Sequence, residues 1–152
     1  MNKRSFLISA LVGLLLLGGA GFAYYTMKMN APAFRGRAIP VKGLPDDLVK
    51  SWETAFQEAL QNEEVLGAIV EESGYAEKLK IPAEEAVAHL KEAARVRLKN
   101  AKGTIEVGLV GKRKNDEALK GIALVLYEEA EKEVLEIAPS YQEYLDEVSK
   151  KR

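Results

Sequence analysis

The 152-residue sequence has no cysteine and a single histidine. The absence of cysteine excludes disulfides, thiolate catalysis, cysteine-based zinc sites and a lipid-modified cysteine. It does not by itself assign a cellular compartment. With His89 as the only imidazole, a metal site made of several histidines is also excluded, and no segment has the spacing of a calcium-binding EF-hand loop.

Catalytic motifs are also missing. A catalytic base needs a nucleophile or an orienting carboxylate nearby, and His89 has only Glu85 and Glu92 at helical spacing. The glycine-containing basic stretch 108–121 lacks the spacing of a nucleotide-binding loop. Adjacent glutamates point in different directions on a helix, so the pairs at 63–64, 71–72, 84–85 and 128–129 read as solvated faces. We therefore expect a protein that is not an enzyme and binds no cofactor.

Strong charge of one sign is absent as well. When Lys3 and Arg4 are set aside, the chain retains 20 basic and 23 acidic residues. Such a mildly acidic, mixed surface argues against general nucleic-acid binding.

What the sequence does contain is an apolar run near its start. Between Arg4 and Lys28 lie 23 residues without a charge. A helix rises about 1.5 Å per residue, so this run is long enough to cross a hydrocarbon core of roughly 30 Å. Tyr24 and Tyr25 stand near its end, where aromatic rings favour the membrane interface. We expect residues 1–28 to be an uncleaved membrane anchor.

A cleaved signal peptide is the alternative for this segment. It would combine the basic start, an apolar stretch of roughly 13 residues and the small residues "GFA" at 21–23 as a cleavage site. The charges that directly flank the run favour a cytoplasmic N-terminus. We therefore expect a single-pass protein of the inner (cytoplasmic) membrane, with its C-terminal domain outside the cytoplasm.

Residues 31–138 predict one small α+β domain. "AFRGRAIPV" (33–41) reads as a strand, which Pro40 confines to a sheet edge or a strand end. Helical spacing then predicts one helix from Asp46, a second that Asn62 caps and Gly74 ends, and a third with Pro82 at its first position.

The apolar period changes after the third helix. Alternation over 96–98 and 105–109 predicts two strands that a turn at 100–103 connects. Asn115 is expected to cap a long final helix that Pro139 ends, with 139–152 as a polar tail. The expected order is a transmembrane helix and then β-α-α-α-β-β-α, with helices covering the sheet and the last helix lying on it. The expected common core comprises Trp52, Phe56, Ile69, Leu90, Val107 and Ile122.

Four short segments of this sequence occur in an order that is typical of one protein family. They are "APAFRGRAIPV" (31–41) directly after the apolar run, "NEEVLGAIVEESGY" (62–75), "LKIPAEEAVAHL" (79–90) and "GTIEV" (103–107). Together they resemble the N-terminal periplasmic domain of the polysaccharide co-polymerases, the chain-length determinants of lipopolysaccharide O-antigen, capsule and exopolysaccharide. The coiled extension and second transmembrane helix of that family have no counterpart in these residues.

The resemblance implies a non-enzymatic membrane protein of surface polysaccharide biosynthesis, in chain-length regulation or export. It would act through self-association beside a polysaccharide polymerase or export protein. A generic membrane-anchored scaffold in an envelope or secretion complex is the alternative function. Arg35 and Arg37, together with Lys28 and Lys42, are candidates for contact with anionic lipid headgroups or an acidic glycan. The candidates for contact with a second copy are Lys112, Arg113 and Lys114. These three are a candidate complement to Glu71 and Glu72 of another copy.

Overall fold

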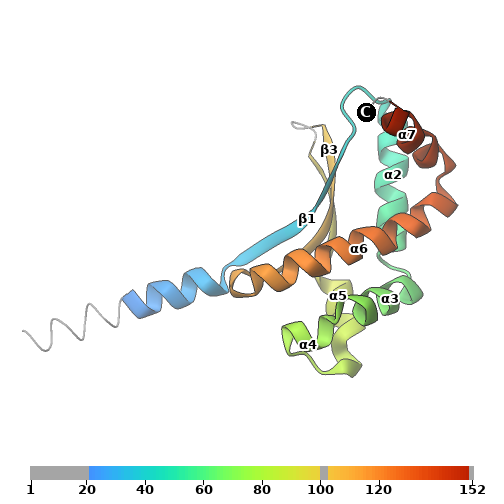
Figure 1. The fold of residues 1–152 in the computed structure, drawn as a ribbon. Coiled ribbons are helices and arrows are strands. Elements are labelled where there is room, and N and C mark those ends of the chain that lie inside the picture. Colours follow the sequence, from blue (N-terminus) through green and yellow to red (C-terminus); the bar gives the residue numbers. More distant parts are fainter. Residues whose placement is uncertain (1–20, 100–102, 151–152) are drawn as a thin grey trace, which may run out of the picture.

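The computed structural model describes residues 21–99 and 103–150 (Figure 1). Residues 21–30 are helical and lead directly into the first strand. The elements that follow are β1 (Pro32–Pro40), α2 (Asp46–Ala59), α3 (Glu63–Ser73), α4 (Tyr75–Leu79), the 3-10 turn η1 (Ala83–Glu85), α5 (Ala86–Ala93), β2 (Ala94–Lys99), β3 (Thr104–Lys112), the 3-10 turn η3 (Arg113–Asn115), α6 (Asp116–Ile137) and α7 (Pro139–Lys150). The α+β class is confirmed.

The three strands form one antiparallel sheet in the order β1-β3-β2. β1 pairs with β3 along its whole length, from Pro32 opposite Lys112 to Pro40 opposite Thr104. Pro40 therefore lies on an edge strand, as predicted, where its missing N–H removes no hydrogen bond from the ladder.

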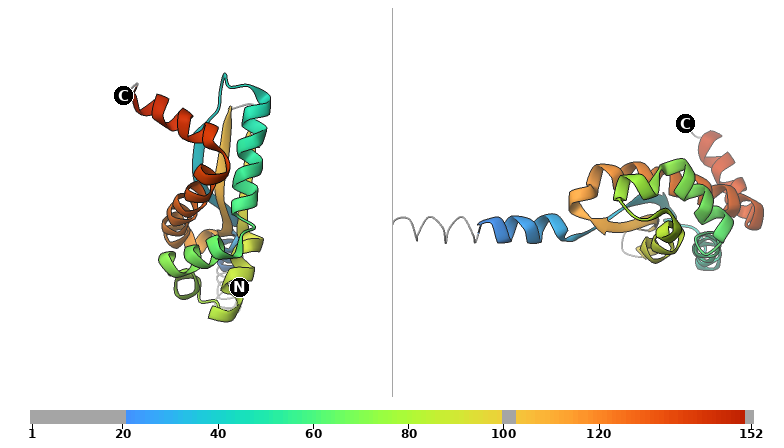
Figure 2. Two further views of the ribbon diagram at one scale, coloured as in Figure 1. Left: turned by 90° about the vertical axis from the view of Figure 1, so that its right-hand side faces the viewer. Right: turned by 90° about the horizontal axis from the view of Figure 1, so that it is seen from below.

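Among the described residues, helices cover one face of this sheet and leave the other open. On β3, the alternate residues Ile105, Val107 and Leu109 are fully buried. The side chains of Arg95 and Arg97 on β2 point to the other face and are exposed. Figure 1 views the sheet almost edge-on, with α2 and α7 on the same side of it, and Figure 2 shows the strands behind these helices. The predicted contact of the final helix with the sheet is confirmed, because α6 packs on β1 and β3.

The expected core is also confirmed. Its six predicted members are each 0 % exposed and belong to one apolar cluster: Trp52, Phe56, Ile69, Leu90, Val107 and Ile122. Both ends of α3 also lie where the sequence predicts them. The side chain of Asn62 accepts a hydrogen bond from the Glu64 amide at 2.9 Å, and Gly74 ends the helix with φ of +62°.

Other boundaries differ from the expectation. Between Gly74 and α5 the chain forms α4 and η1, and Pro82 precedes η1 rather than opening a longer helix. Asn115 stands before α6, but its side chain makes no capping hydrogen bond there, because η3 already turns the chain into the helix. Ile137, the last residue of α6, is 46 % exposed.

The prediction that residues 139–152 are a polar tail is wrong for the described part. Residues Pro139–Lys150 form α7, and its Tyr141 is fully buried. The rings of Tyr141 and Trp52 meet edge-on with centroids 5.1 Å apart, and Trp52 Nε1 donates to Ser140 Oγ at 3.0 Å. Tyr144 Oη also donates to the Pro40 carbonyl at 2.7 Å. A few aromatic side chains thus attach an otherwise polar helix to the core.

Most of the predicted anchor and three residues of the predicted β2–β3 turn lie outside the described residues. Within 21–99 and 103–150, no helix combines the length and apolarity that a membrane crossing requires.

We predict that Tyr141→Ala destabilises the domain by about 3–5 kcal/mol, because it removes a fully buried aromatic side chain. The measurement is urea unfolding followed by the fluorescence of Trp52, the single tryptophan. Gln142→Ala, at an exposed neighbouring position, is the control and should change stability by less than about 0.5 kcal/mol. Equal stability of both variants would show that α7 does not contribute to the core.

Candidate interaction site

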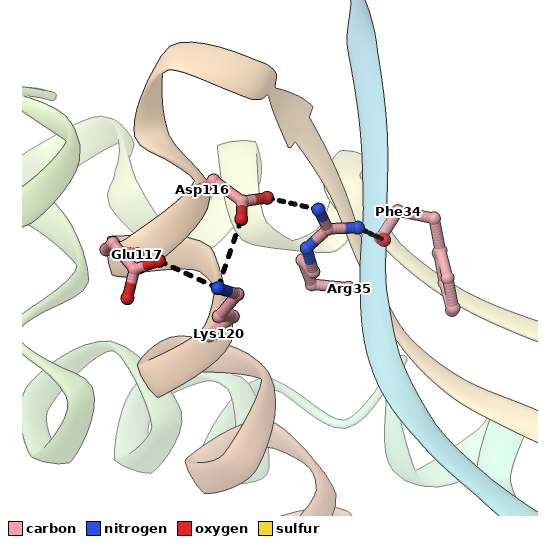
Figure 3. A network of polar contacts seen from close by, with 5 residues as sticks. All are labelled: Phe34, Arg35, Asp116, Glu117 and Lys120. Carbon is pink, nitrogen blue, oxygen red and sulfur yellow. Dashed lines mark hydrogen bonds and ion pairs between the residues drawn. The ribbon is translucent and has the colours of Figure 1, made fainter.

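Arg35 is tied to the start of α6 (Figure 3). Its Nη2 lies 2.5 Å from Asp116 Oδ1, and its Nη1 donates to the Phe34 carbonyl at 2.8 Å. Lys120 Nζ lies 3.3 Å from the other oxygen of Asp116 and 2.7 Å from Glu117 Oε1. This network joins β1 to the first turn of α6, so Arg35 serves the fold as well as the surface.

The network shifts two pKa values. Partial desolvation acts to raise the pKa of Asp116, but hydrogen bonds and charge from Lys120 and Arg35 outweigh it and lower that pKa below its usual value of 3.8. The Glu117 and Asp116 carboxylates raise the pKa of Lys120. The carboxylate of Asp116 is therefore favoured in the folded state.

Arg37 also faces α6. Its guanidinium carbon lies 5.1 Å from the centroid of the Tyr127 ring, a cation–π arrangement. The Tyr127 hydroxyl donates to Glu131 Oε1 at 2.5 Å and lies 2.8 Å from the Tyr141 hydroxyl. Burial raises the pKa of both tyrosines, so both remain neutral donors at physiological pH. Arg37 thus covers a hydrogen-bonded cluster that joins α6 to α7.

Lys112, Arg113 and Lys114 lie apart from these two arginines, at the end of the domain where the chain enters. All three side chains are exposed. Lys112 is opposite Pro32 in the β ladder, and the Arg113 amide donates to the Ala31 carbonyl at 3.0 Å. Among the described residues, none of the three forms an ion pair. The five candidate residues therefore divide into two tied to α6 and three that are free at the chain entry.

The uncovered face of the sheet is a surface that sequence reasoning missed. The Arg97 guanidinium carbon lies 4.3 Å from the centroid of the Phe34 ring on this face. Gly36 and Gly108 are paired beneath that ring, and a Cβ on Gly36 would overlap both the Val107 carbonyl oxygen and the tip of Phe34. The glycines thus let the aromatic ring lie flat on the sheet.

The same face carries excess positive charge. Lys99 is paired with Glu106 at 2.7 Å, whereas Arg95 and Arg97 have no carboxylate partner in the described part of the chain. The alternation of apolar and basic residues in "ARVRLK" (94–99) could have indicated this surface. A strand whose even positions are apolar and buried directs its odd positions to the opposite face. We call Phe34, Gly36, Arg95, Arg97 and Gly108 the open sheet face.

His89 lies on α5 with an exposed ring, whose Nδ1 shares a hydrogen bond with the Tyr75 hydroxyl at 2.8 Å. Tyr75 is fully buried, and burial raises its pKa to about 12. Across residues 21–99 and 103–150, no three histidine, aspartate or glutamate side chains are grouped closely enough to hold a metal ion.

Comparisons with protein-family models, with curated proteins and with solved structures found no match to this chain.

We predict that Asp116→Asn lowers the stability of the domain at pH 7, because it removes the negative charge that Arg35 and Lys120 contact. A carboxyl whose folded-state pKa is lowered stabilises the fold above its ordinary pKa and loses that contribution as the pH falls through the folded value. The difference between wild type and variant should therefore be present at pH 7 and disappear at an acidic pH below the lowered folded-state pKa of Asp116. Urea unfolding at both pH values is the measurement, and Glu117→Gln, at a more exposed carboxylate, should show a smaller difference at pH 7.

Proposed function

We propose that this chain is a membrane-anchored, extracytoplasmic, non-enzymatic protein of surface polysaccharide biosynthesis, in chain-length regulation or export. It acts by contact between copies held side by side in the inner membrane, next to a polysaccharide polymerase or export protein. The first 28 residues anchor it, and residues 31–150 form the contacting domain.

The observation that best supports a membrane anchor is the helix at residues 21–30. It projects away from the sheet and its covering helices (Figure 2), and its large apolar side chains are uncovered. Phe22, Tyr24, Tyr25 and Met27 are between 59 and 75 % exposed. The domain has a complete core without them, so their burial requires another apolar environment, and the uncharged run that precedes them suits a bilayer.

The polysaccharide assignment rests on the resemblance of most of residues 31–135 to the co-polymerase domain. The segments that carry the resemblance lie on elements in the order expected for that domain. The first lies on β1 directly after the helix at 21–30, the next on α3, and the last on β3. This placement supports the assignment at the level of element order.

The open sheet face supports action through contact between copies. It presents the unpaired Arg95 and Arg97, whereas the outer surface of α7 carries Glu143, Asp146 and Glu147, all without a basic partner among the described residues. The two surfaces are complementary in charge and lie on different sides of the domain, which gives a head-to-tail contact. Such contacts close into rings when the rotation between copies permits, and anchoring in one plane raises their effective concentration.

We predict that Arg97→Glu reduces crosslinking between membrane-bound copies by about tenfold or more, because like charges opposed across an interface cost several kcal/mol. Ala38→Cys, on an exposed position of β1, provides a single thiol, which a thiol-to-amine crosslinker can join to Lys150 on α7 of the next copy. Lys50→Glu makes the same change of charge on α2 and should leave crosslinking unchanged.

Surface glycan length in the same cells tests the polysaccharide assignment. Deletion of the chain should alter the length distribution on a gel, and Arg97→Glu should reproduce that change. Crosslinked copies with an unchanged glycan length would favour the generic envelope scaffold. A wild-type chain that stays monomeric at native density would contradict the proposal that copies act through contact with one another.

A further inference from the structure

We infer that the end of the domain where the chain enters is a binding site for anionic phospholipid, which holds the domain upright on the bilayer. The site comprises the basic cluster Lys112, Arg113 and Lys114 and the apolar groove beside it. The inference rests on the proposed membrane anchoring and adds a ligand class and a surface to it.

The position of the basic cluster follows from the β ladder. Met27 ends the uncharged run, and Pro32, five residues later, is paired with Lys112. Five residues span at most roughly 18 Å when fully extended, and less here because the chain is helical as far as residue 30. The Arg113 amide is also hydrogen-bonded to the Ala31 carbonyl, which fixes the cluster to the chain entry. If residues up to Met27 are in the bilayer, the cluster lies within reach of its headgroups.

Charge decides which lipids this end prefers. Lys112, Arg113 and Lys114 are exposed, and Lys28 adds a fourth exposed positive charge three residues before Ala31. The nearest carboxylates along the chain, Asp116 and Glu117, are already paired with Lys120, and Asp116 also with Arg35. Each basic side chain near an anionic membrane surface contributes attraction that decays within a Debye length, about 10 Å at moderate salt.

An apolar groove opens beside the cluster. It has a volume of about 400 Å³, and its wall includes Leu79, Ile81 and Leu119, with Lys112, Asn115 and His89 also lining it. A groove with apolar walls and a basic residue at hand suits a lipid, whose acyl portion contacts the walls while its phosphate contacts Lys112.

A second copy of the chain is a poorer occupant of this site. Glu71 and Glu72, the candidate complement from the sequence, lie on α3 of another copy, which no fixed connection brings to the basic cluster. The proposed anchor, in contrast, is part of the same chain and places the bilayer close to the basic cluster. This contrast favours lipid over protein at Lys112, Arg113 and Lys114.

The test uses the full-length chain in vesicles of phosphatidylcholine, with or without phosphatidylglycerol, whose acyl chains carry bromine as a quencher. Because the chain lacks cysteine, Asn115→Cys places one fluorescent label at the groove and Gln142→Cys places one on α7 at the far end. We expect the Asn115→Cys label to be quenched severalfold more in the anionic vesicles, with added salt reversing the gain. The Gln142→Cys label should respond equally to both.

Charge variants give the matched comparison. Lys112→Gln, Arg113→Gln and Lys114→Gln together should lower the ratio of docked to undocked domain by roughly a hundredfold, the effect of three charges near an anionic surface. Lys42→Gln, Lys50→Gln and Lys150→Gln together remove the same charge from exposed positions elsewhere and should leave the ratio unchanged.

Three outcomes separate the hypotheses. Extraction of the chain by alkaline carbonate would overturn the anchoring itself. A chain that resists extraction, with equal quenching of Asn115→Cys in both vesicle types, would leave the anchoring intact and overturn lipid binding. Efficient crosslinking between copies through Asn115→Cys in phosphatidylcholine alone would assign this end to self-association and also overturn lipid binding.

Discussion

Ile105, Val107 and Leu109 bury one face of the sheet, and the other surfaces of the domain follow from that one-sided burial. Successive side chains of a strand point to opposite faces, so residues between these three cannot join the same core. α2 and α6 pack on the apolar face, which leaves Phe34 and Arg97 on a sheet surface that no described element covers. The open sheet face is thus a consequence of where the apolar side chains lie along the strands.

Elements with a clear apolar period could be predicted from the sequence, and α7 could not. The helical spacing in α2, α3 and α6 reflects several buried positions in each, whereas α7 has only Tyr141 fully buried. Its attachment depends on Trp52, which is distant in sequence. The spacing of apolar residues within α7 cannot indicate such a contact. Most residues of α7 are exposed, so its composition reads as a solvated tail.

The candidate site was predictable only in part, for a related reason. No acidic residue is near Arg35 or Arg37 in the sequence, yet the fold supplies Asp116 to one and the Tyr127 ring to the other. The open sheet face requires the register that places Gly36 opposite Gly108, and this register depends on pairing between segments about 70 residues apart. Lys112, Arg113 and Lys114 were found from the sequence, but their position beside the chain entry came from the same register.

The full-length pairing of β1 with β3 also has a mechanical consequence. The helix at residues 21–30 leads into the start of β1, so tension between that helix and the rest of the domain acts along this strand. Interstrand hydrogen bonds of an antiparallel ladder run perpendicular to the strands, and a pull along β1 therefore strains all of them together in shear rather than opening them one by one. β1 is therefore the element best arranged to resist a pull on the domain through the helix at residues 21–30.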